Sequence, residues 1–199
     1  MTDLTEQELI RIVHRYYPTG SFAVSDSYTQ EVPPYTRTAE HQRWMEAWKQ
    51  AMEWPAWDSL LEELDIALGS AGDVTQPYMA ACRRCSRSEK QPLPDGAQLV
   101  TRAIAAVSVL APLYVTYCIT ETVGPRSEPL FHHFSFEPTD DVKPHFVTLA
   151  RTIERVLGYR PFPLHLHNVL VPEVFVPHLG GEQATLLYAL FDKELHNLP

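Results

Sequence analysis

The chain has 199 residues, of which 45% are hydrophobic and 21% are charged. A chain of this length buries about 70% of the surface that its unfolded form exposes, and these proportions exclude a disordered or membrane-embedded class. The 25 Asp and Glu residues against 16 Lys and Arg residues give a formal net charge of -9. This charge repels phosphate backbones, so we expect no nucleic-acid partner; it favours a basic protein partner, or it serves only solubility.

Several features indicate a cytoplasmic protein. The first eight residues are polar and acidic and lack the basic and apolar regions of a secretory signal. The longest apolar run, residues 103–116, contains Ser108 and Pro112 and is shorter than the ~20 residues that a membrane-spanning helix needs. We therefore expect no membrane association. Three cysteines, an odd number, favour free thiols in a reducing compartment.

The N-terminal part, up to about residue 72, is predicted to be helical. Thr5 and Glu8 have the spacing of a capping box, and the apolar residues that follow predict a first helix that ends at Pro18. Residues 21–37 are rich in Ser, Asp, Thr and Pro and read as a long connection. A connection of this length in a compact domain is often functional.

A pair of helices is predicted after this connection. Thr38 can cap the second helix, and Pro55 ends or kinks it. The third helix follows at once and carries a regular apolar stripe. Four tryptophans lie between residues 44 and 57, an arrangement more typical of the core of a helical pair than of a ligand cage. The stripe consists of Trp57, Leu60, Leu61, Leu64 and Leu68.

β-branched and aromatic residues predict a sheet in the middle of the chain. Residues 100–109 and 113–120 read as an antiparallel hairpin that turns at Ala111-Pro112, although residues 97–110 alone could also form a buried helix. Residues 131–136 are a third strand, in which Phe134 and Phe136 share a face.

Further elements are predicted toward the C-terminus. Asp140 or Asp141 can cap a fourth helix that Gly158 terminates. Residues 164–176 supply one or two short edge strands broken by Pro172, and residues 182–195 form a last, buried helix. We therefore expect one α+β domain over residues 1–199. N-terminal helices would pack on a mainly antiparallel sheet with a C-terminal helix, the mixed α/β part covering about residues 97–199.

The cysteine pair Cys82 and Cys85 has the spacing of a metal or redox site. A zinc ribbon needs two more ligands, and the third cysteine, Cys118, lies in a predicted strand. A redox pair opens a helix after a strand, which the order of elements here does not provide. We therefore favour structural thiols, although the intervening Arg83 and Arg84 would lower a thiol pKa if these residues were exposed.

A histidine cluster is the second chemical candidate. In a strand, His165 and His167 would point to one face and could share a metal ion with His132 or His133. A metal-dependent enzyme would also need a base such as Glu137 or Glu173. With nine histidines in the chain, partly buried, hydrogen-bonded side chains are the simpler interpretation. Because nucleophile elbows and phosphate-binding loops are absent too, we assign no catalytic, metal or cofactor residue.

Four segments of the C-terminal half carry a family resemblance: residues 108–115, 157–159, 171–174 and 181–191. In these packing and turn residues the chain resembles small bacterial proteins similar to the immunity proteins of polymorphic toxin systems. The resemblance implies a fold and, by association, a binding role. It supplies no catalytic residues.

These observations lead us to expect a non-enzymatic cytosolic binding protein, most consistent with an immunity-type inhibitor whose acidic surface meets a basic toxin active site. The alternatives are a small metal-dependent enzyme that uses the histidine cluster and a structural subunit. One group of candidate contacts lies around the long connection: Asp26, Tyr28, Glu31 and Tyr35. A second group is the acidic cluster Glu62, Glu63 and Asp65, which a solvated helix face explains equally well.

Overall fold

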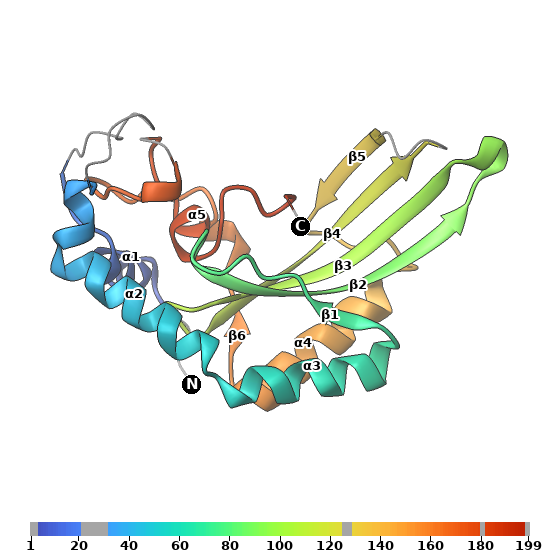
Figure 1. Cartoon of the computed structure of the whole chain (residues 1–199), viewed down its shortest axis with the longest axis horizontal. Coiled ribbons are helices and arrows are strands. Elements are labelled where there is room, and N and C mark those ends of the chain that lie inside the picture. The colour runs from blue at the N-terminus through green and yellow to red at the C-terminus, as the bar shows by residue number, and fades with distance from the viewer. Residues whose placement is uncertain (1–3, 21–31, 125–128, 180–181, 198–199) are drawn as a thin grey trace.

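The structure is a computed structural model that describes residues 4–20, 32–124, 129–179 and 182–197. Helices cover both faces of a six-stranded, mostly antiparallel open sheet (Figure 1). This arrangement confirms the predicted α+β class, with helices before and after the sheet. In the described part of the chain, no helix is long and apolar enough to cross a membrane.

The N-terminal helices begin at the predicted residues. Helix α1 (Glu6–Tyr16) starts with the capping box: the Thr5 hydroxyl accepts from the Glu8 amide, and the Glu8 carboxylate accepts from the Thr5 amide (2.7 Å). Thr38 caps helix α2 (Ala39–Met52), and helix α3 (Pro55–Leu68) starts at its proline. A short 3-10 helix, η1 (Pro34–Arg37), precedes α2.

The sheet is built in chain order, each strand antiparallel to the next. The strands are β1 (Ala71–Asp73), β2 (Cys82–Pro92), β3 (Gln98–Ser108), β4 (Leu113–Val123) and β5 (Pro129–Ser135). A two-residue strand, β6 (Arg160–Pro161), lies parallel to the start of β4. Strands β3, β4 and β5 confirm the predicted strands. Strand β2 was not predicted, because its sequence is dominated by polar and charged residues, yet it pairs with β3 along its whole length.

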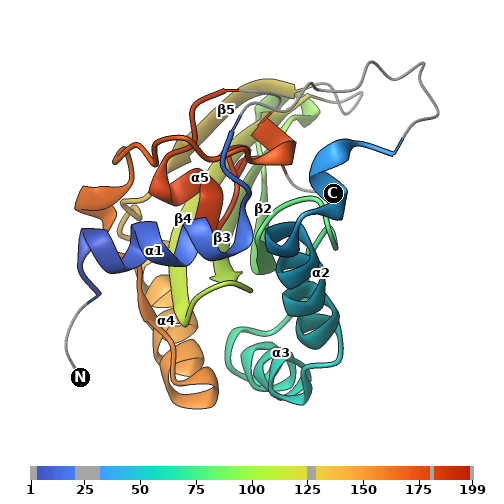
Figure 2. The same ribbon diagram turned by 90° about the vertical axis from the view of Figure 1, so that its left-hand side faces the viewer.

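Alternate residues of the strands pack on different helices. Ala103, Ala105 and Val107 of β3 lie in the core with α3 and with α4 (Lys143–Leu157). Ile104 and Ala106 point to the opposite face, where α1, α2 and the short helix α5 (Leu186–Leu190) pack. In Figure 2, α1 and α5 lie in front of the strands, whereas α3 and α4 lie toward the bottom.

The cap predicted for α4 is wrong, but its end is as predicted. Neither Asp140 nor Asp141 caps this helix, because the amides of Val142 and Lys143 donate instead to the main-chain oxygen of Thr139 (3.0 and 2.9 Å). Gly158 ends the helix in the left-handed conformation (φ 67°), which glycine adopts without steric cost.

The elements predicted after residue 163 are largely wrong. Residues 164–166 form the 3-10 helix η3 (Leu164–Leu166), and the following chain makes only isolated bridges, one of them between Leu170 and Thr185. The predicted last helix shortens to α5, which Thr185 caps and which ends before Asp192, where the side chain pairs with Arg84 of β2. The remaining 3-10 helices are η2 (Pro94–Gly96) and η4 (Pro177–Leu179).

Candidate functional site, an aromatic pocket

The structure does not bring the candidate histidines together. His165 lies in η3 and is exposed, and His167 follows this turn, with its Nδ1 donating to Leu164 O (2.6 Å). His132 and His133 are neighbours in β5 and so point to opposite faces of the sheet. Among the described residues, no group of three His, Cys, Asp or Glu side chains could hold a metal ion. The predicted strand that would have aligned His165 with His167 is wrong.

The proposed bases do not join these histidines. Glu137 lies on the connection between β5 and α4 and Glu173 on the connection after η3, and both side chains are exposed. The nearest charged contact of His132 is Glu121, whose Oε1 is 3.3 Å from Nδ1. The arrangement offers no shared coordination site in this part of the structure.

The cysteines are buried in the sheet. Cys82 and Cys85 lie in β2 and belong to the hydrophobic clusters on opposite faces, so they cannot approach one another. Burial raises the pKa of Cys82 to about 11 and that of Cys85 to about 12. Neither arginine between them acts as an exposed activating cation. Arg83 pairs with Asp73 (2.7 Å), and Arg84 pairs with Asp192.

The folded protein is therefore expected to have inert thiols. Dithiobis(nitrobenzoate) at pH 8 should modify none of the three cysteines in the native state, because Cys118 is also buried and its pKa is also raised by burial. All three should react when guanidinium unfolds the protein. The colour released per mole before and after unfolding checks this, and rapid labelling of either β2 cysteine in the native protein would contradict it.

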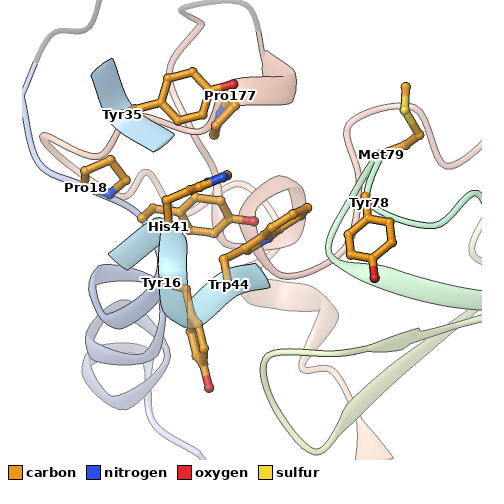
Figure 3. A pocket seen from close by; sticks show the side chains of 9 residues that line it. Tyr16, Pro18, Tyr35, His41, Trp44, Tyr78, Met79 and Pro177 are labelled. Atoms are coloured by element: carbon orange, nitrogen blue, oxygen red, sulfur yellow. The ribbon is translucent and has the colours of Figure 1, made fainter. Parts of the chain in front are cut away.

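A pocket of about 90 Å³ opens where the end of α1, η1, the start of α2 and the turn before β2 meet (Figure 3). Three of its lining residues are buried and form its base: Tyr17, Pro18 and Trp44. Four are half-buried: Tyr16, Tyr35, His41 and Pro177. Tyr78 and Met79, which are 44% and 63% exposed, lie across from the Tyr35, His41 and Trp44 group in Figure 3. The lining contains no Lys, Arg, Asp or Glu.

The rings of the pocket belong to a continuous aromatic row. Tyr35 meets His41 at a ring-centroid distance of 5.2 Å, and His41 stacks on Trp44 at 5.8 Å. The row continues through Trp48 to Tyr78, with centroid distances of 6.2 and 5.3 Å. All lie within the range of favourable ring contacts. The row therefore links η1, α2 and the turn before β2.

Hydrogen bonds anchor the base of the pocket and the aromatic row to the body of the protein. The Tyr17 hydroxyl donates to the main-chain oxygen of Ala189 in α5 (2.9 Å). The Trp48 indole donates to the main-chain oxygen of Ala80 (2.8 Å), which lies two residues after Tyr78. The base of the pocket and the turn that carries Tyr78 are thus held by the core.

Tyr78 has an unusual backbone conformation. Its φ is 64°, in the left-handed region that glycine favours, and a bulky side chain there is an outlier. Such conformations cost about 1–3 kcal/mol and concentrate at functional sites. The strain places the exposed Tyr78 ring against Trp48, at the side of the pocket.

Charged side chains lie beside the pocket and not in its lining. Burial lowers the pKa of His41, so its imidazole is neutral at pH 7. Arg43 pairs with Glu40 (2.8 Å) and also donates to Arg15 O (2.7 Å). The Arg15 guanidinium lies 5.6 Å from the centre of the Tyr16 ring. The cavity itself is therefore lined by neutral, mostly aromatic groups.

The predicted contact residues divide between this pocket and other places. Tyr35 lines the pocket, whereas Asp26, Tyr28 and Glu31 lie outside the described residues. Glu62 and Asp65 lie on the exposed side of α3, and Glu63 pairs with Arg155 of α4. The acidic cluster is thus a helix face separate from the pocket.

No protein-family model matches this chain. Searches of curated proteins and of solved structures likewise find no match. The resemblance to immunity proteins stays a prediction.

Proposed function

We propose that this protein acts by stoichiometric binding to another protein, as an immunity-type inhibitor of a toxin, without catalysis of its own. The aromatic pocket is the observation that carries this proposal. Small-molecule sites commonly enclose about 300–1,000 Å³, whereas this pocket has about 90 Å³. A space of this size suits one side chain of a partner rather than a whole metabolite.

The composition of the pocket supports a protein partner. Tyr, Trp and Met are enriched in the central parts of protein interfaces, where Lys, Asp and Glu are depleted. The pocket has this composition, and its Tyr78 and Met79 are exposed although both are large and apolar. The strained backbone of Tyr78 further supports a binding role, because packing alone does not require an exposed ring at a left-handed position.

The net charge supports a basic partner. A chain with a charge of -9 attracts a basic surface over several ångströms and so raises the association rate. Glu62 and Asp65 on the exposed side of α3 contribute to this field. The inhibitor would act by covering the basic active site of its toxin while the pocket holds one side chain of that toxin.

The direct test uses the proteins encoded next to this one. Each is mixed with the purified protein, and the mass of any complex is measured by size-exclusion chromatography with light scattering. We expect a 1:1 complex with one neighbour, loss of that neighbour's toxic activity, and rescue of growth when the two are co-expressed. If no encoded neighbour forms a complex, or if the complex leaves its activity unchanged, the proposal is wrong.

Tyr78→Gly separates binding from stability in this complex. Glycine relieves the left-handed strain while the partly exposed ring is lost, so we expect the free energy of unfolding to change by less than about 1 kcal/mol. Affinity for the identified partner should fall about 30-fold, the effect of an interface side chain contributing about 2 kcal/mol. Isothermal titration calorimetry and urea unfolding measure the two quantities.

Ser70→Gly is the matched control, because Ser70 also has a positive φ (85°) and is exposed, but lies at the end of α3 outside the pocket. It should relieve comparable strain and leave the affinity unchanged. If Tyr78→Gly left the affinity for the partner unchanged, the pocket would not be part of the interface.

A further inference from the structure

We propose that the pocket receives an arginine side chain of the partner, held between aromatic rings. This inference rests on the proposed function, because it names the chemistry of the group that enters the pocket. The relevant rings are those of Tyr35, Trp44 and Tyr78, which come from three separate segments and line one cavity (Figure 3). The faces of Trp and Tyr carry negative electrostatic potential and attract cations.

The part of the chain that the structure describes already contains this interaction. The Arg83 guanidinium lies 4.5 Å from the centre of the Trp57 ring, and Arg15 lies 5.6 Å from that of Tyr16. In each case a guanidinium, not an ammonium, occupies the ring face. Arginine suits a narrow aromatic site because its planar head stacks on rings and is more weakly hydrated than the lysine ammonium.

The electrostatics of the site permit an incoming cation. None of the lining residues carries a charge at pH 7, since the pKa of His41 is lowered by burial. The positive charge of Arg43 is compensated by Glu40. Arg15 lies against Tyr16, which also lines the pocket, and leaves the rings of Tyr35, Trp44 and Tyr78 to an incoming cation. At longer range the net charge of -9 favours a cation over a neutral or acidic group.

The test uses small probes and needs no partner protein. N-acetyl-arginine methylamide is titrated into the purified full chain, and amide and indole signals are followed by ¹H–¹⁵N NMR. We expect saturable shifts at Tyr35, Trp44 and Tyr78 with a millimolar dissociation constant, as for a single weakly held side chain. The matched probe is N-acetyl-citrulline methylamide, which has the same shape without the charge, and should bind at least about tenfold more weakly.

Two variants test whether the arginine probe binds in this pocket. Tyr78→Gly should weaken arginine binding while keeping a dispersed, folded spectrum, and Ser70→Gly should leave it unchanged. Equal binding of citrulline and arginine, or no saturable shift of the pocket signals with arginine, would overturn the inference. Saturable arginine binding without any complex with an encoded neighbour would instead contradict the proposed function and leave the arginine site standing.

Discussion

Replacing Asp192 by alanine should lower the free energy of unfolding by about 3–5 kcal/mol, the usual cost of leaving one member of a buried ion pair without its partner. The Arg84 side chain is only 4% exposed and that of Asp192 14%. Arg84 also donates to the main-chain oxygen of Asn197 (2.8 Å). Without the carboxylate, a guanidinium stays buried in the sheet with only neutral partners, among them the main-chain oxygen of Asn197 and the side chain of Cys82.

This ion pair also ties the C-terminal residues to β2. Because the chain turns away from α5 just before Asp192, we expect the variant to exchange the amides of residues 192–197 faster, in addition to its lower stability. Urea unfolding and hydrogen exchange measure the two effects. An exposed ion pair in the same region supplies the control: Glu182, 59% exposed, pairs with Lys193, and Glu182→Ala should change stability by less than about 0.5 kcal/mol.

A second comparison separates the lost charge from the lost packing. In the double variant Arg84→Met with Asp192→Leu, apolar side chains replace both charges, and such replacements are often neutral or stabilising. We expect this variant to recover most of the stability lost in Asp192→Ala. If the single and double variants were equally unstable, the buried charge would not be the cause.

The ion pair between Arg84 and Asp192 also explains why strand β2 and the end of the last helix could not be predicted from the sequence. Arg83 and Arg84 look like surface residues in the sequence, and so β2 was missed. Their partners are Asp73 and Asp192, and Asp192 is 108 residues from Arg84. Neither the periodicity of apolar residues nor the spacing of nearby residues can reveal an ion pair between residues so far apart in the chain. The final helix was predicted too long for the same reason, because Asp192 leaves the helix to reach the sheet.

Local signals, by contrast, were predicted well. The capping box of Thr5, the proline that separates α2 from α3 and the glycine that ends α4 each depend on residues within about one helical turn. The hairpin of β3 and β4 depends on two adjacent runs of β-branched residues and a short turn. These features are set by neighbours in the chain, so the sequence shows them directly.

The pocket, in contrast to these local features, could not be predicted from the sequence. Its residues come from separate segments, and only Tyr35 was named as a candidate contact. Trp44 was assigned to the core, which is correct, but its ring also forms part of the base of the pocket. One signal was available in the sequence: Tyr16-Tyr17 at the end of the predicted first helix and Tyr78-Met79 between predicted elements are pairs of large side chains next to connections. Their convergence, however, is a property of the fold.

Trp48→Ala is expected to lower the free energy of unfolding by about 3–5 kcal/mol, the range for removing a large buried aromatic side chain. Trp48 is fully buried, in the middle of the aromatic row, and contacts both Trp44 and Tyr78. Its loss would also leave Ala80 O, which sits in a buried residue, without the indole donor.

Trp48→Phe separates the contribution of the buried ring from that of the indole hydrogen bond, because phenylalanine keeps a ring in the row but cannot donate to Ala80 O. We expect it to cost about 1–3 kcal/mol, from the missing hydrogen bond and the smaller ring. In both variants Tyr78 loses part of its support, so the pocket signals should shift even in the folded protein. Trp54→Ala, at a half-buried tryptophan outside the pocket, should leave those signals in place. If Trp48→Phe were as stable as the original protein and left the Tyr78 amide signal unmoved, the indole would not hold this turn, and the strained Tyr78 backbone would need another support.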